Sequence, residues 1–92
     1  YVWDNSNPVG TRMKSAYTDR AQLVVAETGT GRTGRWVTER ADVAADFARA
    51  FGNVPGKPTQ IAVAVDTDNT RSLARGAFAD LHFVARDKPC AF

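Results

Sequence analysis

The sequence has few of the residue types that metal centres and nucleophilic active sites require. Its 92 residues include one cysteine and one histidine, which excludes an intrachain disulfide, a cysteine-based zinc site and a multi-histidine centre. No apolar run approaches the roughly 18 to 20 residues of a membrane-spanning helix. Twelve Lys and Arg oppose ten Asp and Glu, a net charge of +2. Because the basic residues are scattered and phosphate binding needs clustered ones, no nucleic-acid partner is expected.

The remaining composition is that of a soluble globular domain. Hydrophobic residues make up 43% and charged residues 24%, and the length suits one domain over residues 1–92, with residues 86–92 as a loose tail. The pattern of a strand is already present at Tyr1-Val2-Trp3. A domain seldom opens within a pairing strand, so we expect part of a longer chain. Its sheet should have an open edge that pairs with a missing N-terminal segment of the same protein or with a protein partner.

Strand patterns dominate the rest of the chain. Residues 21–27 (AQLVVAE) predict a strand, residues 28–34 a glycine-rich hairpin loop, and residues 35–39 the returning strand. Residues 60–65 (QIAVAV) predict a buried strand, and residues 77–85 alternate apolar and polar side chains as a half-buried strand does. Four or five strands without strand–helix alternation predict a mainly β chain with an antiparallel sheet.

Residues 42–51 change to the helical period. Val43, Phe47 and Phe51 are spaced four residues apart and form one apolar face of a short helix. We expect this face to be buried against the sheet. On that basis Phe47→Ala should cost roughly 3 to 5 kcal/mol.

The ends and the polar side of this helix are also predictable. Asp42 is a candidate N-cap, and Gly52 stands where a left-handed residue ends a helix. Asp46 and Arg49 are expected on the exposed side.

Four segments carry a family resemblance: YVWDNSNPVG, AYTDRAQLVV, WVTERADVAADFARAFG and IAVAVDTDNT. They resemble, in the same order and with similar gaps up to Phe83, a bacterial envelope family of unknown function numbered three-zero-four-seven. The chain differs from the family pattern at residues 77–83, where the family usually has aromatic-Gly-Asp-Ile and this chain has FADL. The resemblance implies a galactose-binding-like β-sandwich (jelly roll), here its C-terminal part, and a periplasmic or secreted protein. It implies no activity.

Acidic and amide side chains follow two predicted strands. Asp66, Asp68 and Asn69 in the string DTDNT are oxygen ligands of the kind that Ca²⁺ accepts, although no EF-hand loop follows them. The same side chains commonly accept backbone hydrogen bonds where a strand ends, and we expect this structural role for Asp66 and Asp68. Asp4 and Asn5 close another strand in the same way.

Polar and aromatic residues elsewhere suit either packing or recognition. Asp19 and Arg20, after Tyr17, either form structural ion pairs or bind the hydroxyl groups of a ligand. Trp3, Tyr17 and Trp36 could stack on a sugar ring. Trp36 lies within a predicted strand, so we expect it to pack in the sheet.

Two motifs that could indicate nucleotide binding or catalysis lack the structural context that these functions need. The string GTGRTG at residues 29–34 matches the dinucleotide-binding pattern, but a strand pattern follows where a helix is needed, so it predicts a loop. His82 and Cys90 are eight residues apart, with no reason to face each other as a catalytic dyad.

Together these features favour a non-catalytic, exported binding or accessory module, such as an accessory subunit of an envelope complex with a protein partner. The alternatives are a carbohydrate-binding module with a glycan ligand, and an acid-dependent hydrolase using Asp66, Asp68 and Asp80. No cofactor is expected, apart from a structural calcium that Asp66, Asp68 and Asn69 could hold. The candidate ligand-binding residues are Asp4, Asn5, Tyr17, Asp19, Arg20, Asp66, Asp68 and Asn69.

Overall fold

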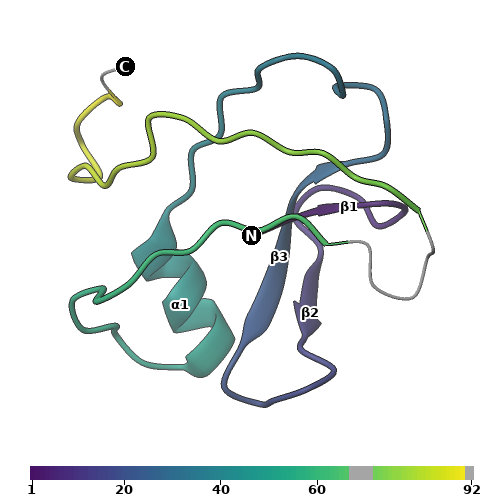
Figure 1. The fold of residues 1–92 in the computed structure, drawn as a ribbon. Helices are drawn as coiled ribbons and strands as arrows, with labels where there is room; N and C mark the ends of the chain where they lie inside the picture. Colours follow the sequence, from purple (N-terminus) through teal and green to yellow (C-terminus); the bar gives the residue numbers. More distant parts are fainter. Residues whose placement is uncertain (67–71, 91–92) are drawn as a thin grey trace. The chain divides into compact units, whose positions relative to one another are not determined.

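A computed structural model describes residues 1–66 and 72–90 of the chain (Figure 1). The chain divides into two units, Tyr1–Val54 and Pro55–Phe92, and each is described by itself. The predictions for Asp68 and Asn69 lie outside the described residues.

The first unit contains a three-stranded mixed sheet (Figure 1). Its strands are β1 (Val2–Asp4), β2 (Arg12–Lys14) and β3 (Gln22–Thr28), in the order β1-β3-β2. β3 lies in the centre, parallel to β1 and antiparallel to β2. The predicted strand at the start of the chain and the strand over residues 21–27 are therefore confirmed, the second shifted by one residue.

β3 contains the buried centre of this unit. Its β-branched pair includes Val25, whose exposed fraction is 0%, and two residues later Glu27 is 7% exposed. The amides of Gly10 and Val25 also bond to the carbonyls of Val25 and Thr11, at 2.8 and 2.9 Å. The loop before β2 is thereby fastened to the central strand.

Helix α1 (Val43–Phe51) lies beside β3 in the same unit (Figure 1). The Asp42 side chain accepts a hydrogen bond from the amide of Ala45 at 3.0 Å, as an N-cap does. Gly52 adopts φ 78° and its amide bonds to the Ala48 carbonyl at 2.8 Å. The helix and both of its caps are confirmed.

The expected burial of α1 is wrong. No residue of the helix is buried: Val43 and Phe51 are 39% and 38% exposed, and Phe47 is half-buried. The surface opposite the helix is partly polar and open: the Gln22 side-chain amide donates to the Ala50 carbonyl at 2.7 Å, and a hollow lies between helix and strand. Asp46 also differs from the prediction: its side chain is 18% exposed and faces the sheet.

The predicted hairpin after β3 does not form. Residues 35–39 are not a strand, and Trp36, expected to pack in the sheet, is 71% exposed. Both edges of β3 are already occupied, by β1 on one side and β2 on the other, so a returning strand has no edge to pair with. The parallel β1–β3 pairing likewise corrects the expectation of an antiparallel sheet.

The second unit has no helix or strand among its described residues, 55–66 and 72–90. The strands predicted over residues 60–65 and 77–85 are therefore wrong for this structure, and both segments are exposed. A strand needs a neighbour whose backbone groups accept and donate its ladder bonds, and these segments do not pair with each other. The regular structure of the described chain is thus mainly β, with one short helix.

Candidate functional site

The Asp4 carboxylate fulfils the structural role that its position suggested. It accepts hydrogen bonds from the amides of Ser6 and Asn7, at 3.2 and 2.6 Å, and closes the turn after β1. These backbone bonds, that of Asn7 first, hold the pKa of Asp4 below its ordinary value. Asn5 stands exposed in the same turn.

The predicted group around Tyr17 lies in the exposed connection between β2 and β3. Tyr17 is 91% exposed, and Asp19 and Arg20 are exposed in the same turn. The amides of Tyr17 and Arg20 bond to the hydroxyls of Ser15 and Thr18, both at 3.1 Å, so the polar contacts shown here shape the turn.

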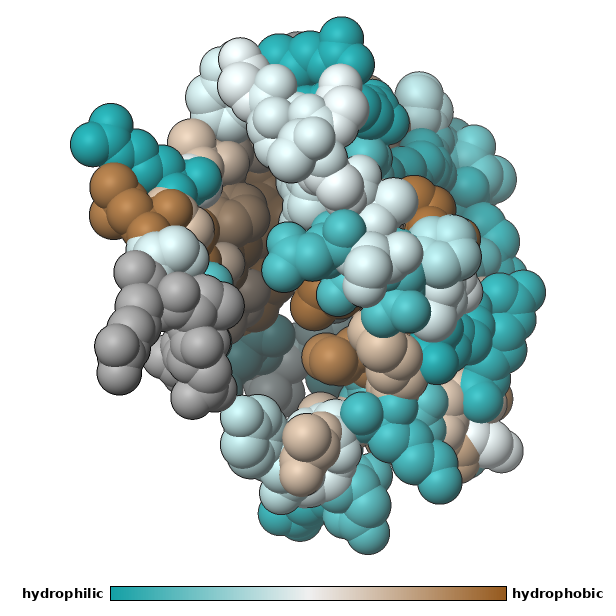
Figure 2. All heavy atoms as spheres, turned by 90° about the vertical axis from the view of Figure 1, so that its right-hand side faces the viewer, coloured by the Kyte–Doolittle hydropathy of each residue, from teal (hydrophilic) through white to brown (hydrophobic). Residues whose placement is uncertain are grey.

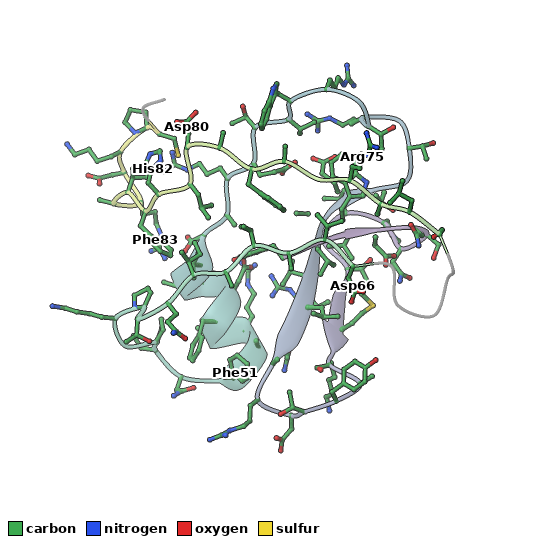
Figure 3. The ribbon with its side chains drawn as sticks, viewed as in Figure 1. Phe51, Asp66, Arg75, Asp80, His82 and Phe83 are labelled. Carbon is green, nitrogen blue, oxygen red and sulfur yellow. The ribbon has the colours of Figure 1, made fainter. Side chains whose placement is uncertain are left out.

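The acidic residues assigned to a hydrolase are not brought together where the structure describes them. Asp66 and Asp80 lie well apart in the second unit (Figure 3). Asp80 adopts φ 55°, and its carbonyl lies 2.8 Å from Nδ1 of His82. Within the described ranges no three His, Cys, Asp or Glu residues are placed to share a metal ion.

The glycine-rich string lies in a loop, as predicted. Gly29 and Gly34 adopt positive φ, 67° and 77°, and the Thr33 amide bonds to the Thr30 carbonyl at 3.3 Å. No helix begins at Gly34, since α1 starts nine residues later at Val43. The geometry that would present free amides to a pyrophosphate is therefore missing from this loop.

An acidic cluster that the sequence analysis did not identify lies at the end of β3. The Glu27 side chain is 9% exposed and pairs with Arg32, whose Nη1 is 3.0 Å from Oε2. Glu39 hydrogen-bonds the same carboxyl group. Burial, and after it the hydrogen bond and the charge of Glu27, raise the pKa of Glu39 to about 7.

A second cluster that the sequence analysis did not identify consists of two arginines and a tyrosine around Asp46 on α1. Arg12 Nη2 lies 2.7 Å from Oδ1, Arg49 Nη1 lies 3.7 Å from the same atom, and the Tyr1 hydroxyl donates to Oδ2 at 2.5 Å. The bonds from Tyr1 and then Arg12 lower the pKa of Asp46, and burial with the Asp46 bond raises that of Tyr1. In the sequence, this cluster is indicated by the i,i+3 spacing of Asp46 and Arg49, which places the two side chains next to each other on a helix.

Asp46 borders a hollow of about 140 Å³ between α1 and β3. Its apolar wall includes the rings of Phe47 and Phe51, whose centroids are 4.8 Å apart. The full lining is Tyr1, Gln22, Val24, Val43, Asp46, Phe47, Ala50 and Phe51.

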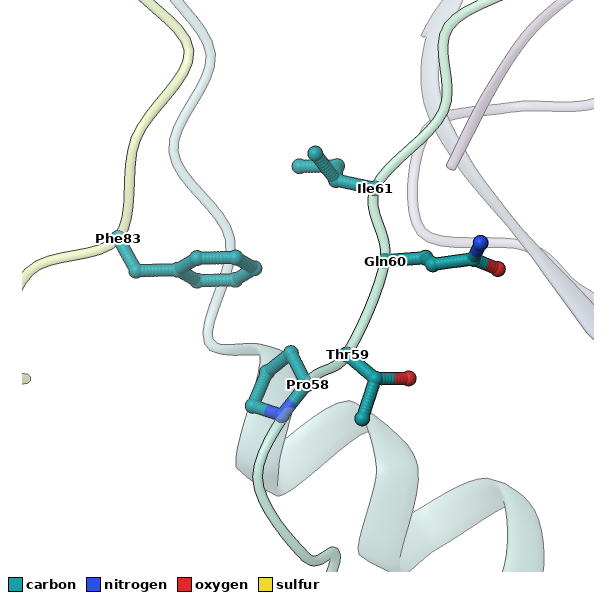
Figure 4. Close-up of a pocket in the computed structure, with 5 residues that line it drawn as sticks. All are labelled: Pro58, Thr59, Gln60, Ile61 and Phe83. Atoms are coloured by element: carbon teal, nitrogen blue, oxygen red, sulfur yellow. The ribbon is translucent and has the colours of Figure 1, made fainter.

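The second unit has a hollow of about 200 Å³, lined by Pro58, Thr59, Gln60, Ile61 and Phe83. The side chains of Pro58, Ile61 and Phe83 point into it, whereas those of Thr59 and Gln60 point away (Figure 4). Ile61 and Phe83 are 57% and 56% exposed, so this is an open, apolar depression.

Further large apolar side chains of the same unit are exposed: Val63, Val65, Leu73, Phe78, Leu81 and Val84. Figure 2 shows apolar residues (brown) at the surface among polar ones (teal). We call residues 60–65 and 77–85, with their exposed apolar side chains, the apolar segments. They are the candidate functional surface.

The family model described as a protein of unknown function (DUF3047) matches residues 1–82. The chain belongs to this family. No match was found among curated proteins or among solved structures. The DUF3047 match covers the sheet, the helix, all of residues 60–65 and residues 77–82 of the second apolar segment, and its description assigns no activity. In the described part of the chain, no helix has the length and apolar character to cross a membrane.

Proposed function

We propose that this DUF3047 chain is a non-catalytic module of the bacterial envelope that binds a protein partner through its apolar segments. The observation that carries the proposal is the conflict between pattern and structure in residues 60–65 and 77–85. Both have the alternation and composition of strands, yet Ile61, Leu81 and Phe83 are each more than half exposed. An extended apolar segment without a ladder partner is suited to accept a strand.

The occupant we propose is an extended strand of the partner protein. Strand addition supplies the missing ladder hydrogen bonds, and alternate side chains of the added strand can enter the hollow beside Phe83. Each fully buried side chain of the Ile or Phe type contributes about 1.5 to 3 kcal/mol, so covering several of them offsets the ordering of both segments.

We retain as part of the proposal the galactose-binding-like sandwich expected from the family resemblance. Strand pairing of the apolar segments would add to the β content that such a sandwich requires. The resemblance also supports an exported, periplasmic or secreted location. Neither glycan binding nor hydrolysis has a comparable geometric support among the described residues, because Tyr17, Asp19 and Arg20 lie in an exposed turn. Asp66 and Asp80 lie apart from each other.

The test uses a photo-crosslinking residue in place of Phe83, with Tyr17 as the matched exposed aromatic position in the other unit. In bacterial envelopes, we expect a crosslinked protein at position 83 and none at position 17. That protein is then purified and mixed with the chain, and hydrogen exchange is measured. Slowed exchange across residues 60–65 and 77–85, lost in Phe83→Asp, supports the proposal.

Three results would overturn it. They are unchanged exchange in the mixture, equal crosslinking from both positions, and saturable binding or hydrolysis of a glycan by the chain alone. Hydrolysis that is lost on Asp66→Asn would revive the enzyme hypothesis.

A further inference from the structure

Asp80 has an unusual backbone conformation within the second apolar segment. Among the described residues other than glycine, it alone has a positive φ, 55°. In this left-handed region an L-residue places its Cβ close to the following carbonyl oxygen, which Asp and Asn tolerate better than β-branched residues do. A regular strand needs φ of about −120° to about −140°. The strand pattern of residues 77–85 is therefore interrupted at Asp80.

The two apolar segments approach each other at one end. A Cβ added to Gly76 would lie 2.4 Å from Cγ2 of Val65, so the Val65 side chain occupies the space beside Gly76. From this contact the chain runs back along residues 60–65 and forward along residues 77–85 (Figure 1). The segments thus run in opposite directions, as the strands of an antiparallel ladder do.

The register of a ladder is lost beyond this contact. A ladder that continued from Val65 and Gly76 would bring Ile61 opposite Asp80, because each is four residues away from the contact. Ile61 instead shares its hollow with Phe83, three residues after Asp80. The left-handed residue therefore stands at the position where the two segments fail to meet.

A contact within the second segment accompanies the bend. The Asp80 carbonyl oxygen lies 2.8 Å from Nδ1 of His82. In a ladder, carbonyl groups accept from a neighbouring strand, whereas this oxygen faces a side chain two residues along its own segment. Extending Asp80 would release the carbonyl for a ladder bond.

We propose that Asp80 is a backbone switch that controls strand addition at the apolar segments. In the free chain its left-handed conformation keeps residues 77–85 bent. When the partner strand pairs with this segment, Asp80 becomes extended, and residues 76–81 come into register with residues 60–65. This regulation rests on the proposed function, because it sets the affinity for the same partner.

The side chain at position 80 determines how strongly the bend is favoured. Asp and Asn are several-fold enriched in the left-handed region, whereas a β-branched residue there is an outlier. A β-branched residue at position 80 should therefore depopulate the bent form, and the form that binds a strand becomes more populated. Asn and Thr are both polar and uncharged, so comparing them leaves charge and apolar surface unchanged.

The first measurement uses the isolated chain. NMR chemical shifts of Cα and Cβ in residues 79–82 report the backbone conformation of the native chain, Asp80→Asn and Asp80→Thr. We expect left-handed values at residue 80 in the native chain and in Asp80→Asn, and strand-like values in Asp80→Thr. Strand-like values at Asp80 in the native chain overturn the switch, and so do left-handed values in Asp80→Thr.

The second measurement is the affinity for the protein that crosslinks at position 83. Asp80→Thr should bind it at least about fivefold more tightly than the native chain does, and Asp80→Asn should bind it as the native chain does. Gln60→Thr is the matched control. It places a β-branched residue in the other apolar segment, at a position without a positive φ whose side chain points away from the hollow (Figure 4).

The switch and the proposed function can fail separately. Equal affinities of Asp80→Asn and Asp80→Thr overturn the switch, and so does a gain in Gln60→Thr as large as that in Asp80→Thr. Crosslinking at position 83 and protection of both segments would still support the proposed function. If no protein crosslinks at position 83, the proposed function fails, and the chemical shifts of the isolated chain still test the bend at Asp80.

Discussion

A single carboxylate, Asp46, joins the helix to residues at both edges of the sheet. Tyr1 adjoins edge strand β1, Arg12 lies in edge strand β2, and both contact Asp46 on α1. These partners are 45 and 34 residues away along the chain. Sequence spacing shows Arg49 as a neighbour of Asp46 but has no information about contacts at such separations.

Asp46→Asn should destabilise the first unit by about 1 to 2 kcal/mol, because charge-assisted hydrogen bonds to a partly buried carboxylate are lost. The pKa of Asp46 is lowered by folding, so its stabilisation is present above the ordinary value of 3.8. This stabilisation disappears as pH falls through the folded-state value.

Urea unfolding at pH 7 and at pH 3 measures both effects. The stability difference between the native chain and Asp46→Asn should be present at pH 7 and should shrink at pH 3. Asp19→Asn, in the exposed turn before β3, is the control and should match the native chain. Equal stabilities of native chain and Asp46→Asn at pH 7 would contradict the assigned role.

At the scale of elements, α1 is the part of the chain that local chemistry predicts best. Its bounds follow from the N-cap Asp42 and the left-handed Gly52, and its face from the spacing of Val43, Phe47 and Phe51. How deeply that face is buried depends on the opposing surface. β3 presents Gln22 and Val24 there, and the polar Gln22 bonds to the end of the helix.

Gly52→Ala should cost about 1 kcal/mol, since an alanine at φ 78° has a Cβ too close to the following carbonyl. Gly31→Ala is the matched control: its φ is not positive and no atom lies within 4 Å of the added Cβ. Thermal unfolding followed by circular dichroism compares the two. A loss of stability in Gly31→Ala as large as that in Gly52→Ala would argue against the cap.

Phe47→Ala should cost about 1 to 2 kcal/mol, below the range expected for a fully buried phenylalanine, because the ring is half-buried beside an open hollow. Val54→Ala, at a position 85% exposed, should be nearly neutral. Denaturant unfolding distinguishes the cases. A cost of 3 kcal/mol or more would mean that the helix packs more tightly on the sheet in solution.

At the scale of the whole molecule, the two units differ in whether their extended segments form the backbone hydrogen bonds of a β-sheet. β3 has ladder partners on both sides, whereas residues 60–65 and 77–85 have none among the described residues. In the isolated chain, amides of Val24 and Val25 should therefore exchange slowly and those of both apolar segments nearly as fast as in unfolded peptides.

Residue-resolved hydrogen exchange at constant pH measures this contrast. Slow exchange across residues 60–65 in the isolated chain would show that this segment is paired without any partner. Such a result would also remove the structural basis for strand addition.

The helix, its caps, the central strand and the turn at Asp4 follow from the sequence, because each depends on residues within a few positions of one another. Other features depend on contacts between distant segments. β1 rather than residues 35–39 occupies the second edge of β3, and Glu39 lies against Glu27, twelve residues earlier. Which strands pair, and which charged groups meet, depends on contacts between parts of the chain that are distant in the sequence. The apolar alternation of residues 60–65 predicts a strand but does not determine which strand it would pair with.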